Sequence, residues 1–221
     1  MNTLAHQLQP ERCRFKATPA TMLSEIKRRY RHRNGGGIFA EPKLDGIRYL
    51  LQVKPNGANI NYLTSRRISV ETGNFVEKQD VVTHLRDAAF LSYWDNTVID
   101  GELVGGSLSS DTQHEMVNGD VTYHCFDILI CRGDDVRSLP WHQRQAMLYT
   151  FCRDHVHFPG IKLVQANEHI SEVLYEELEA GREGIVIKHN DSKYGEDWMK
   201  IKRADPFDCF ITGVEMSTAA R

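Results

Sequence analysis

The stretch Glu41-Pro42-Lys43-Leu44-Asp45-Gly46-Ile47-Arg48 joins two candidate strands, residues 38 to 42 and residues 47 to 53. It brings a lysine, a carboxylate two residues later, a glycine and an arginine to one junction. A lysine attacks an electrophile only when it is neutral, whereas its ordinary pKa is about 10.4. A pKa near 7 would cost roughly 4 kcal/mol and would need desolvation or nearby cations. A cationic phosphate pocket with bound metal would provide that setting, and a surface turn is the alternative.

Outward from this stretch, short apolar or alternating segments predict a series of strands. They cover residues 38–42, 47–53, 59–64, 97–104, 121–130, 162–165, 184–189 and 198–202. Lys54-Pro55-Asn56-Gly57 predicts a hairpin turn between the second strand and the third. Helices are expected at residues 18–33, after Thr18 as N-cap, at 140–156, and at 169–180, which Gly181 closes. Hairpin-paired strands with intervening helices predict an α+β fold rather than a parallel, doubly wound sheet.

Length and composition bound the class of protein. The chain has 221 residues, 41% hydrophobic and 26% charged, which fits one sizeable globular domain with or without short appendages. No apolar run approaches the roughly 20 residues that span a bilayer, and no charged-then-apolar leader opens the chain. The five cysteines are scattered and form no C-x-x-C pair, so reduced thiols are expected. We therefore expect a cytoplasmic protein that makes no contact with a membrane. We also expect a monomer.

Charge is distributed unevenly along the chain. Residues 12 to 33 carry eight lysines or arginines against one acid, Glu25. Residues 71 to 135 carry thirteen acids against three basic residues. This asymmetry favours one face that meets phosphates and another that does not. A solvated basic helix without a partner is the alternative.

Two apolar strands carry acids. Alternation in Val98-Ile99-Asp100-Gly101-Glu102-Leu103 puts Asp100 and Glu102 on one face. Burying both would be costly unless they meet a metal, an arginine or a ribose hydroxyl, and a solvated edge strand is the alternative. The strand with Phe126-Asp127-Ile128-Leu129 is very apolar, and its aromatic residue taken alone is more typical of a core.

Two further strands carry lysines. Glu183-Gly184-Ile185-Val186-Ile187-Lys188 opens on a glutamate and ends on a lysine. In Trp198-Met199-Lys200-Ile201-Lys202 the period of two places Lys200 and Lys202 on one face and Met199 and Ile201 towards the core. Two adjacent lysines would repel each other by about 1 kcal/mol unless an anion lies between them. A half-exposed basic strand is the alternative.

Taken in order, these motifs resemble those of the covalent nucleotidyltransferases, specifically the ATP-dependent DNA ligases. The matching set is KLDGIR from Lys43, Ser65-Arg66-Arg67, DGEL from Asp100, FDIL from Phe126, EGIVIK from Glu183 and WMKIK from Trp198. The set spans residues 41 to 202, which is most of the chain. The resemblance implies an ATP-grasp-like nucleotidyltransferase domain with mainly antiparallel sheets flanked by helices.

The resemblance also implies roles for individual residues. Lys43 would take AMP from ATP as a covalent lysyl-adenylate, with Asp45, Lys200 and Lys202 as the other catalytic residues. The implied nucleotide-binding residues are Glu41 at the adenine edge, Arg48 and Arg66 at phosphate or ribose, Glu102 at the ribose, Phe126 stacked on adenine, Lys188 as a phosphate contact, and Lys200 and Lys202 at the α-phosphate. Magnesium would be held by Glu183, Asp45 and Glu102.

By the same resemblance, AMP would pass to the 5′-phosphate of nicked duplex DNA, and the strand would then be sealed. The basic segment before Asn34 would contact backbone phosphates of the duplex. Residues 1–36 would form that basic segment with its short helix, and residues 37–203 the adenylation domain. Residues 204–221 would hold a linker and the first strand, at 207 to 214, of an OB-fold cut short, so that adenylation is retained and sealing weakened.

One departure and two alternatives accompany the resemblance. Ile68 stands where the Ser-Arg motif usually has glycine, which leaves the turn at Arg66 open. An RNA ligase or an mRNA-capping guanylyltransferase would share the lysine motif, although EGIVIK, WMKIK and FDIL are closer to the DNA-ligase pattern. A nucleotide- or nick-binding module without catalysis is the second alternative, and the intact Lys43, Glu183 and Lys200 argue against it.

Overall fold

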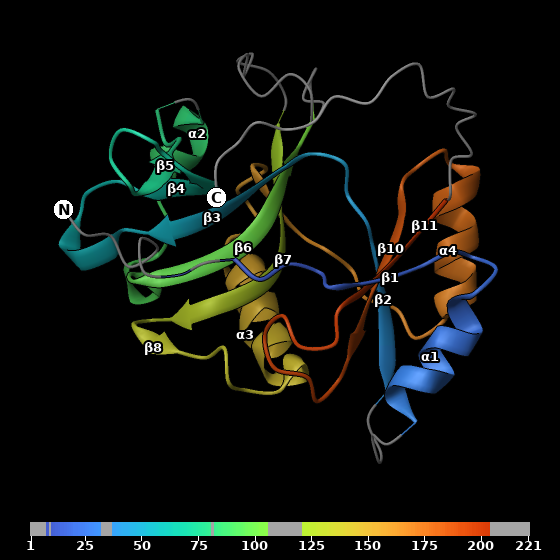
Figure 1. The fold of residues 1–221 in the computed structure, drawn as a ribbon. Helices are drawn as coiled ribbons and strands as arrows, with labels where there is room; N and C mark the ends of the chain where they lie inside the picture. The colour runs from blue at the N-terminus through green and yellow to red at the C-terminus, as the bar shows by residue number, and fades with distance from the viewer. Residues whose placement is uncertain (1–7, 9, 32–36, 81, 106–120, 204–221) are drawn as a thin grey trace, which may run out of the picture.

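Two β-sheets with helices on their outer faces make up the computed structural model (Figure 1), which describes residues 8, 10–31, 37–80, 82–105 and 121–203. The four-stranded sheet has the order β1-β11-β10-β2, and the seven-stranded sheet has the order β5-β4-β3-β6-β7-β8 with β9 paired to β7. All pairs are antiparallel except β1 with β11 and β7 with β9. The α+β fold with mainly antiparallel sheets is confirmed.

The elements have the following bounds. The smaller sheet holds β1 (Phe15–Ala17), β2 (Ile38–Pro42), β10 (Gly184–His189) and β11 (Met199–Lys202). The larger sheet holds β3 (Ile47–Val53), β4 (Tyr62–Ile68), β5 (Phe75–Glu77), β6 (Thr97–Val104), β7 (Thr122–Cys131), β8 (Asp134–Asp135) and β9 (Ile161–Leu163). The helices are α1 (Met22–Tyr30), α2 (Thr83–Arg86), α3 (Trp141–Asp154) and α4 (Ile170–Glu179).

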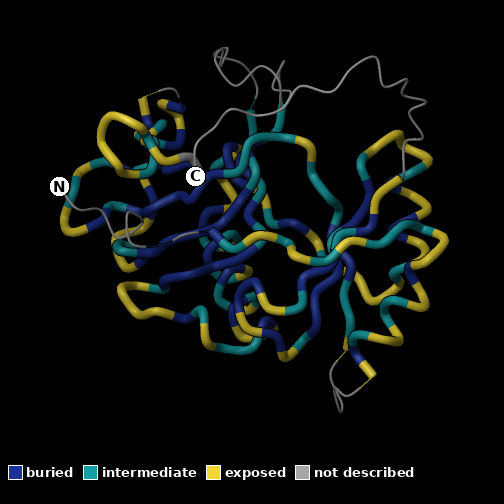
Figure 2. The backbone as a smooth tube through the Cα atoms, in the orientation of Figure 1, coloured by how far each residue is buried: buried dark blue, intermediate teal, exposed yellow. Residues whose placement is uncertain are grey.

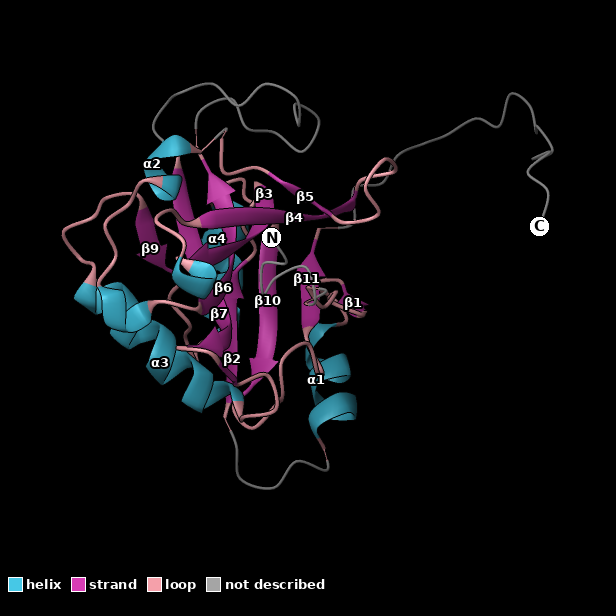
Figure 3. Ribbon diagram, turned by 90° about the vertical axis from the view of Figure 1, so that its left-hand side faces the viewer, coloured by secondary structure: helices cyan, strands magenta, loops and turns pink. Residues whose placement is uncertain are grey.

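Three apolar clusters hold these layers together. The largest lies between the seven-stranded sheet and α3, and its members include Ile99, Leu148 and Phe151 (Figure 3). The second lies between the four-stranded sheet and helices α1 and α4, which cover one face of it. The third joins Leu50 of β3 to Trp198 before β11, so it lies where the two sheets meet. The strands β3, β6 and β7 are accordingly buried over most of their length (Figure 2).

A chain of buried charges crosses from one sheet to the other. The guanidinium of Arg144 in α3 donates two hydrogen bonds, of 2.8 and 3.1 Å, to the carboxylate of Asp127 in β7. Both side chains are fully buried. Lys188 of β10 lies 4.0 Å from that carboxylate and 2.8 Å from the carboxylate of Glu41 in β2. Its ammonium also donates to the carbonyl oxygen of Phe126 at 3.0 Å. Charges buried in this way are tolerated only when each is paired and hydrogen-bonded.

Most of the expected elements occur where the sequence places them. The bounds predicted for β2, β3, β6 and β10 agree with the structure, and the other strands and the helices α3 and α4 shift by one to four residues at their ends. The turn expected at residues 54 to 57 joins β3 to β4, and Gly181 follows α4 with a φ of +72°.

The expected helix at residues 18–33 is wrong at its start. Helix α1 begins at Met22, because Thr18 and Thr21 bond to each other's backbone and side chains in a turn ahead of it. The short elements β1, β5, β8 and α2 were not expected, and each has only two to four residues. The expected linker and OB-fold strand within residues 204–221 lie outside the described residues. No helix in the described ranges is long and apolar enough to cross a membrane.

Replacing Arg144 by methionine tests the importance of the buried charges. The substitution would leave the buried carboxylate of Asp127 with Lys188, 4.0 Å away, as its cationic partner and without its two hydrogen bonds from a guanidinium group, so the free energy of unfolding should fall by about 3 to 5 kcal/mol. Arg153→Met is the matched control on the same helix, because Arg153 pairs with Asp154 at the exposed surface and should change stability little. Both values come from urea denaturation followed by circular dichroism. Equal effects of the two substitutions would contradict the importance of the buried pair.

Candidate active site

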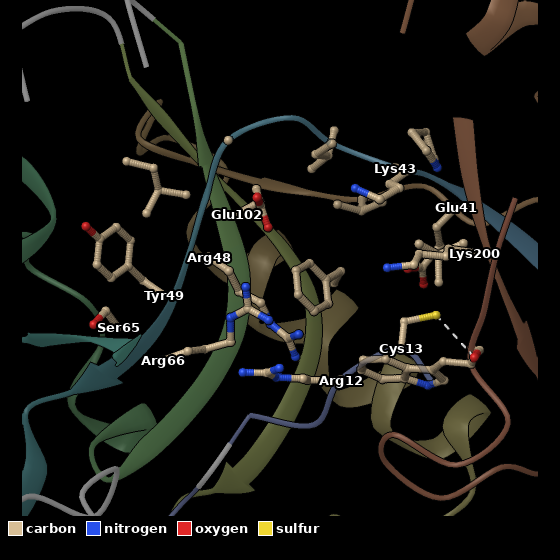
Figure 4. A pocket seen from close by; sticks show the side chains of 18 of the residues that line it. Arg12, Cys13, Glu41, Lys43, Arg48, Tyr49, Ser65, Arg66, Glu102 and Lys200 are labelled. Atoms are coloured by element: carbon tan, nitrogen blue, oxygen red, sulfur yellow. Dashed lines mark hydrogen bonds between the residues drawn. The ribbon is translucent and has the colours of Figure 1, made fainter. Parts of the chain in front are cut away.

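A cavity of about 850 Å³ opens between the two sheets (Figure 4). Its walls come from both sheets and from the segment that precedes β1. Eight of the predicted site residues line it: Glu41, Lys43, Arg48, Arg66, Glu102, Phe126, Lys188 and Lys200. Asp45, Glu183 and Lys202 are not among the lining residues, although Glu183 contacts Lys43 from the side.

Lys43 follows β2 at the point where the chain crosses to the larger sheet. Its backbone N–H donates to the carbonyl oxygen of Gly184 at 2.8 Å. Gly184 has a φ of +138°, and a Cβ there would lie 2.1 Å from the carbonyl oxygen of Ile201, so only glycine fits. A Cβ at Gly46 would lie 2.2 Å from the carbonyl oxygen of Leu103. Both glycines of the predicted motifs therefore permit the close packing that fixes Lys43.

The ammonium of Lys43 forms an ion pair with Glu183. The other oxygen of Glu183 accepts from Nζ of Lys202 at 3.2 Å. Burial by itself would raise the pKa of Glu183, but the hydrogen bonds and charges of the two lysines hold it below its ordinary value. The lysine predicted to be the nucleophile is thus paired with a carboxylate.

Lys200 adds a further cation to this end of the cavity. Burial lowers the pKa of Lys200, and the positive charges of Lys43 and Lys202 lower it further. Met199 and Ile201 point into the core on the opposite face of β11, as the alternation of the sequence predicts. This crowding of cations favours the binding of an anion.

Glu41 and Lys188 occupy a more deeply buried part of the cavity. Burial raises the pKa of Glu41 to about 7, although Lys188 lies 2.8 Å from its Oε2. Its Oε1 is buried and has no hydrogen-bond partner in the described structure. A buried acceptor without a partner fits a ligand with an N–H donor, such as the exocyclic amine of adenine. Lys188 is committed to Glu41 and the carbonyl of Phe126, so its predicted contact with phosphate stays a prediction.

Arg48 is held by protein groups. Its guanidinium donates to both carboxylate oxygens of Asp100, to the hydroxyl of Tyr194 at 3.2 Å and to the carbonyl oxygen of Glu11 at 2.8 Å. Asp100 is fully buried and also accepts a hydrogen bond of 2.5 Å from Tyr194. Asp100 therefore meets an arginine, which is one of the three partners that its burial required. Four hydrogen bonds leave Arg48 a single N–H for a ligand.

Glu102 and Phe126 present one polar and one apolar surface to the cavity. Burial raises the pKa of Glu102 to about 7 in spite of the positive charges of Arg48 and Lys43. Within the described ranges no hydrogen bond or ion pair satisfies this carboxyl group. The ring of Phe126 is half-buried, lies edge-on to Trp198 at 6.4 Å and lines the cavity. A ribose hydroxyl beside Glu102 and a base beside Phe126 are compatible with these positions.

The predicted magnesium ligands are not gathered into one cluster. Among the described residues, no group of three or more His, Cys, Asp or Glu side chains could hold a metal ion. Asp45 is exposed, and Glu183 is occupied by two lysines. These residues could hold magnesium only together with a nucleotide. The ligands would then be one carboxylate and the phosphate oxygens of the nucleotide.

Sequence reasoning missed several residues that build the site. Tyr194 belongs to no motif, and nothing in the sequence connects it to Asp100. Asp127 lies within the FDIL motif, but no role was predicted for it. Its partner Arg144 lies in α3, for which only the bounds of the helix were predicted. Arg12 lines the cavity but was counted only as part of a basic segment.

Comparisons with known proteins identify a family whose model covers most of the chain. The family described as "ATP dependent DNA ligase domain" matches residues 17–202. A "Probable DNA ligase" of Kineococcus radiotolerans is 28% identical over 194 residues, which are 84% of this chain and 38% of that protein. The "SPbeta prophage-derived DNA ligase-like protein LigB" of Bacillus subtilis is 28% identical over 87% of this chain and 70% of its own length. A "Probable DNA ligase" of Saccharopolyspora erythraea is matched over 40% of its length, so the chain spans about two fifths of the first relatives found.

Solved structures share the fold. The structure described as "mycobacterial DNA ligase D complexed with ATP and MES" aligns with a TM-score of 0.55 at 22% identity, over 76% of this chain and 55% of that one. The ATP-dependent DNA ligase of bacteriophage T7 in complex with ATP aligns with a TM-score of 0.53 at 16% identity, over 90% of this chain and 70% of that one. At these identities the likeness concerns the fold.

The raised pKa of Glu102 predicts a pH-dependent stability. A carboxyl group whose pKa is about 7 in the folded protein and about 4.5 in the unfolded chain costs stability as the pH rises from 4.5 through 7. Glu102→Gln removes that cost, so the variant should match the parent at pH 5 and exceed its unfolding free energy at pH 8 by about 1 to 2 kcal/mol. The exposed Glu172→Gln on α4 should give no such pH-dependent difference. Parallel stability curves for parent and Glu102→Gln would refute the burial argument.

Proposed function

Because the chain belongs to the ATP-dependent DNA ligase domain family, we propose that it takes AMP from ATP onto Lys43 and passes it to DNA. The acceptor in this proposal is the 5′-phosphate at a nick, where a neighbouring 3′-hydroxyl later displaces AMP and seals the strand. The activity, its substrates and its partners are proposed for the protein as a whole, since the chain spans about two fifths of the first relatives it matches, 38% and 40% of their lengths.

One observation carries the proposal: a single cavity joins an amine at one end to an unsatisfied acceptor in its buried part. Lys43 stands among lysines that favour phosphate, and Oε1 of Glu41 lacks a hydrogen-bond donor. The ring centroid of Phe126 lies 5.2 Å from the ammonium of Lys188, which is the partner of Glu41. A purine nucleotide has the matching order of parts, with a base that carries an amine, a ribose and a chain of phosphates.

The first step is an in-line displacement at the α-phosphate. Nζ of Lys43 forms a P–N bond as the P–O bond to pyrophosphate breaks. Glu183 is hydrogen-bonded to Nζ and can receive the proton that Lys43 must lose. Lys200 and Lys202 offset the charge on the phosphate oxygens, so that positioning and electrostatics provide most of the catalysis.

Magnesium fits the phosphate end through Glu183. When bound there with the nucleotide, the ion would supply Lewis-acid stabilisation of phosphate charge. The ion would take the place of Lys202 at Oε1 of Glu183, and Oε2 would remain on Lys43. Asp45 is exposed and would reach such an ion only through water.

DNA would be held in part through the basic surface around β1 and α1. Arg28 and Arg29 are paired there with Glu25 and Asp197. In the part of the chain that the structure describes, Lys16 and Lys27 are exposed and have no acidic partner. Contacts of these cations with backbone phosphates would be independent of base sequence and weakened by salt. A monomer suffices for every step proposed.

Labelled ATP and GTP test the proposal directly. Incubation with either nucleotide, a denaturing gel and mass spectrometry should reveal an acid-labile AMP adduct on Lys43 from ATP alone. Lys43→Ala should abolish the adduct, because no other amine occupies its position at the crossover. Lys162→Ala, which removes an exposed lysine on β9, is the matched control and should label like the parent.

The alternative functions predict other results. A GTP-only adduct would favour a capping-type nucleotidyltransferase. Labelling of the parent by neither nucleotide would favour a binding module without catalysis. Transfer of AMP to RNA nicks in preference to DNA nicks would favour an RNA ligase.

A further inference from the structure

Strand β1 adds a lysine to the face of the four-stranded sheet that borders the cavity. The register of the parallel pair β1–β11 sets Lys16 opposite Lys200. The antiparallel pairs continue the same row through Val186 of β10 to Glu41 of β2. Residues that lie opposite each other in a sheet point to the same face. Lys16 therefore extends a row that already contains two predicted nucleotide-binding residues, Glu41 and Lys200.

The alternation along β1 agrees with this direction of Lys16. Its neighbours Phe15 and Ala17 pack against the apolar cluster between the four-stranded sheet and helices α1 and α4. Lys16 must point to the opposite face, on which Lys200 lines the cavity. Lys16 is exposed, and within the described ranges it forms no hydrogen bond or ion pair. Burial lowers the pKa of Lys200, and the positive charge of Lys16 acts in the same direction.

The order of the strands places Lys16 and Lys43 on opposite sides of Lys200. In the order β1-β11-β10-β2, Lys43 follows the strand at one edge, Lys16 lies on the strand at the other edge, and Lys200 lies between them. Figure 4 shows Lys43 and Lys200 at the same end of the cavity. An in-line displacement at an α-phosphate held there needs the leaving group on the side away from the attacking amine. That side is the one on which β1 lies.

The spacing of the strands also suits the length of the nucleotide. Neighbouring strands lie about 4.8 Å apart, so the steps from Glu41 through Val186 and Lys200 to Lys16 cover about 14 Å. With the base at Glu41 and the α-phosphate at Lys200, the two outer phosphates of ATP would continue towards Lys16. Because Lys16 is exposed on an edge strand, pyrophosphate bound there could leave directly into solvent.

We propose that Lys16 and Lys200 together hold the pyrophosphate that leaves when Lys43 takes AMP. This inference rests on the proposed function and concerns the leaving group of its first step. Lys16 lies outside the family match, which begins at residue 17. Nζ of Lys43 forms a bond to the α-phosphorus and loses a proton to Glu183, while the P–O bond to pyrophosphate breaks and pyrophosphate keeps its electron pair. The two ammonium groups offset the negative charge that develops on the leaving oxygen.

The role in the first step is compatible with a later contact of Lys16 with DNA. Pyrophosphate departs before AMP is transferred, so the ammonium of Lys16 is then free for a backbone phosphate of the duplex. Measurements without DNA therefore isolate the role proposed here.

The test follows both directions of the first step in the 221-residue chain without DNA. Adduct formation is measured against the concentration of ATP, and its reversal against the concentration of inorganic pyrophosphate, starting from the isolated lysyl-adenylate. Lys16→Ala should raise the concentration for half-maximal rate about 10-fold for both ligands, as expected for the loss of one charged hydrogen bond. Lys16→Arg should stay close to the parent, because it keeps the charge and the hydrogen-bond donors.

Two controls separate a pyrophosphate contact from a general disturbance of the site. Lys162→Ala removes an exposed lysine of β9, in the larger sheet, and should depend on ATP and pyrophosphate as the parent does. AMP competes with ATP for the cavity but has no outer phosphates. Its inhibition of adduct formation should therefore be equally strong in Lys16→Ala and in the parent.

The outcomes are distinct. A parent that forms no adduct overturns the proposed function and this inference with it. A parent that forms the adduct, with a Lys16→Ala variant that keeps the parent's dependence on ATP and pyrophosphate, overturns this inference alone and leaves Lys16 to the duplex. Inhibition by AMP that weakens in Lys16→Ala as much as the response to ATP would also overturn it, because the effect would then not depend on the outer phosphates.

Discussion

The structure depends on the chain of buried charges that runs from Arg144 through Asp127 and Lys188 to Glu41. It links helix α3 and the seven-stranded sheet to the four-stranded sheet directly beneath the cavity. Apolar packing between the sheets would allow them to slide, whereas bidentate and charge-assisted hydrogen bonds fix direction as well as distance. The burial of Glu41 and Lys188 is therefore both a structural requirement and the reason that an unsatisfied acceptor faces the cavity.

A second buried network fixes the wall of the cavity that the seven-stranded sheet provides. Asp100, Arg48 and Tyr194 satisfy one another, and Arg48 uses a remaining donor on the backbone of Glu11. Most hydrogen-bond donors and acceptors of these wall side chains are thus paired within the protein. Among the described residues that line the cavity, a ligand can satisfy groups that have no such partner: Oε1 of Glu41, Nε1 of Trp198, the carboxyl group of Glu102, and the guanidinium groups of Arg12 and Arg66. A buried or crowded group without a partner is costly, which is why such groups indicate binding sites.

The sequence predicted the long strands and their motifs well because alternation and turn residues are local signals. The strands β2, β3, β6 and β10 have strong patterns bounded by turns, whereas β1 and β8 have two or three residues and exist only through their pairing. Among the site residues, those inside motifs were located, and eight of them line one cavity. Tyr194, Arg144 and Arg12 were not, because their roles arise from contacts with residues far away in the chain. The commitment of Arg48 to Asp100, and the pairing of Lys43 with Glu183, likewise required side-chain geometry.

The motif that decides the fold is also the link between the two halves of the site. Residues 43 to 46 connect β2 of the smaller sheet to β3 of the larger one, so Lys43 lies at the crossover. Lys200 and Lys202 belong to the smaller sheet, whereas Arg48, Arg66 and Glu102 belong to the larger one. A change in the angle between the sheets would therefore alter the distance between the lysines and the arginines more than any distance within either group. The buried charges beneath the crossover oppose such a change, and they therefore fix the position of Lys43 relative to both groups of cations.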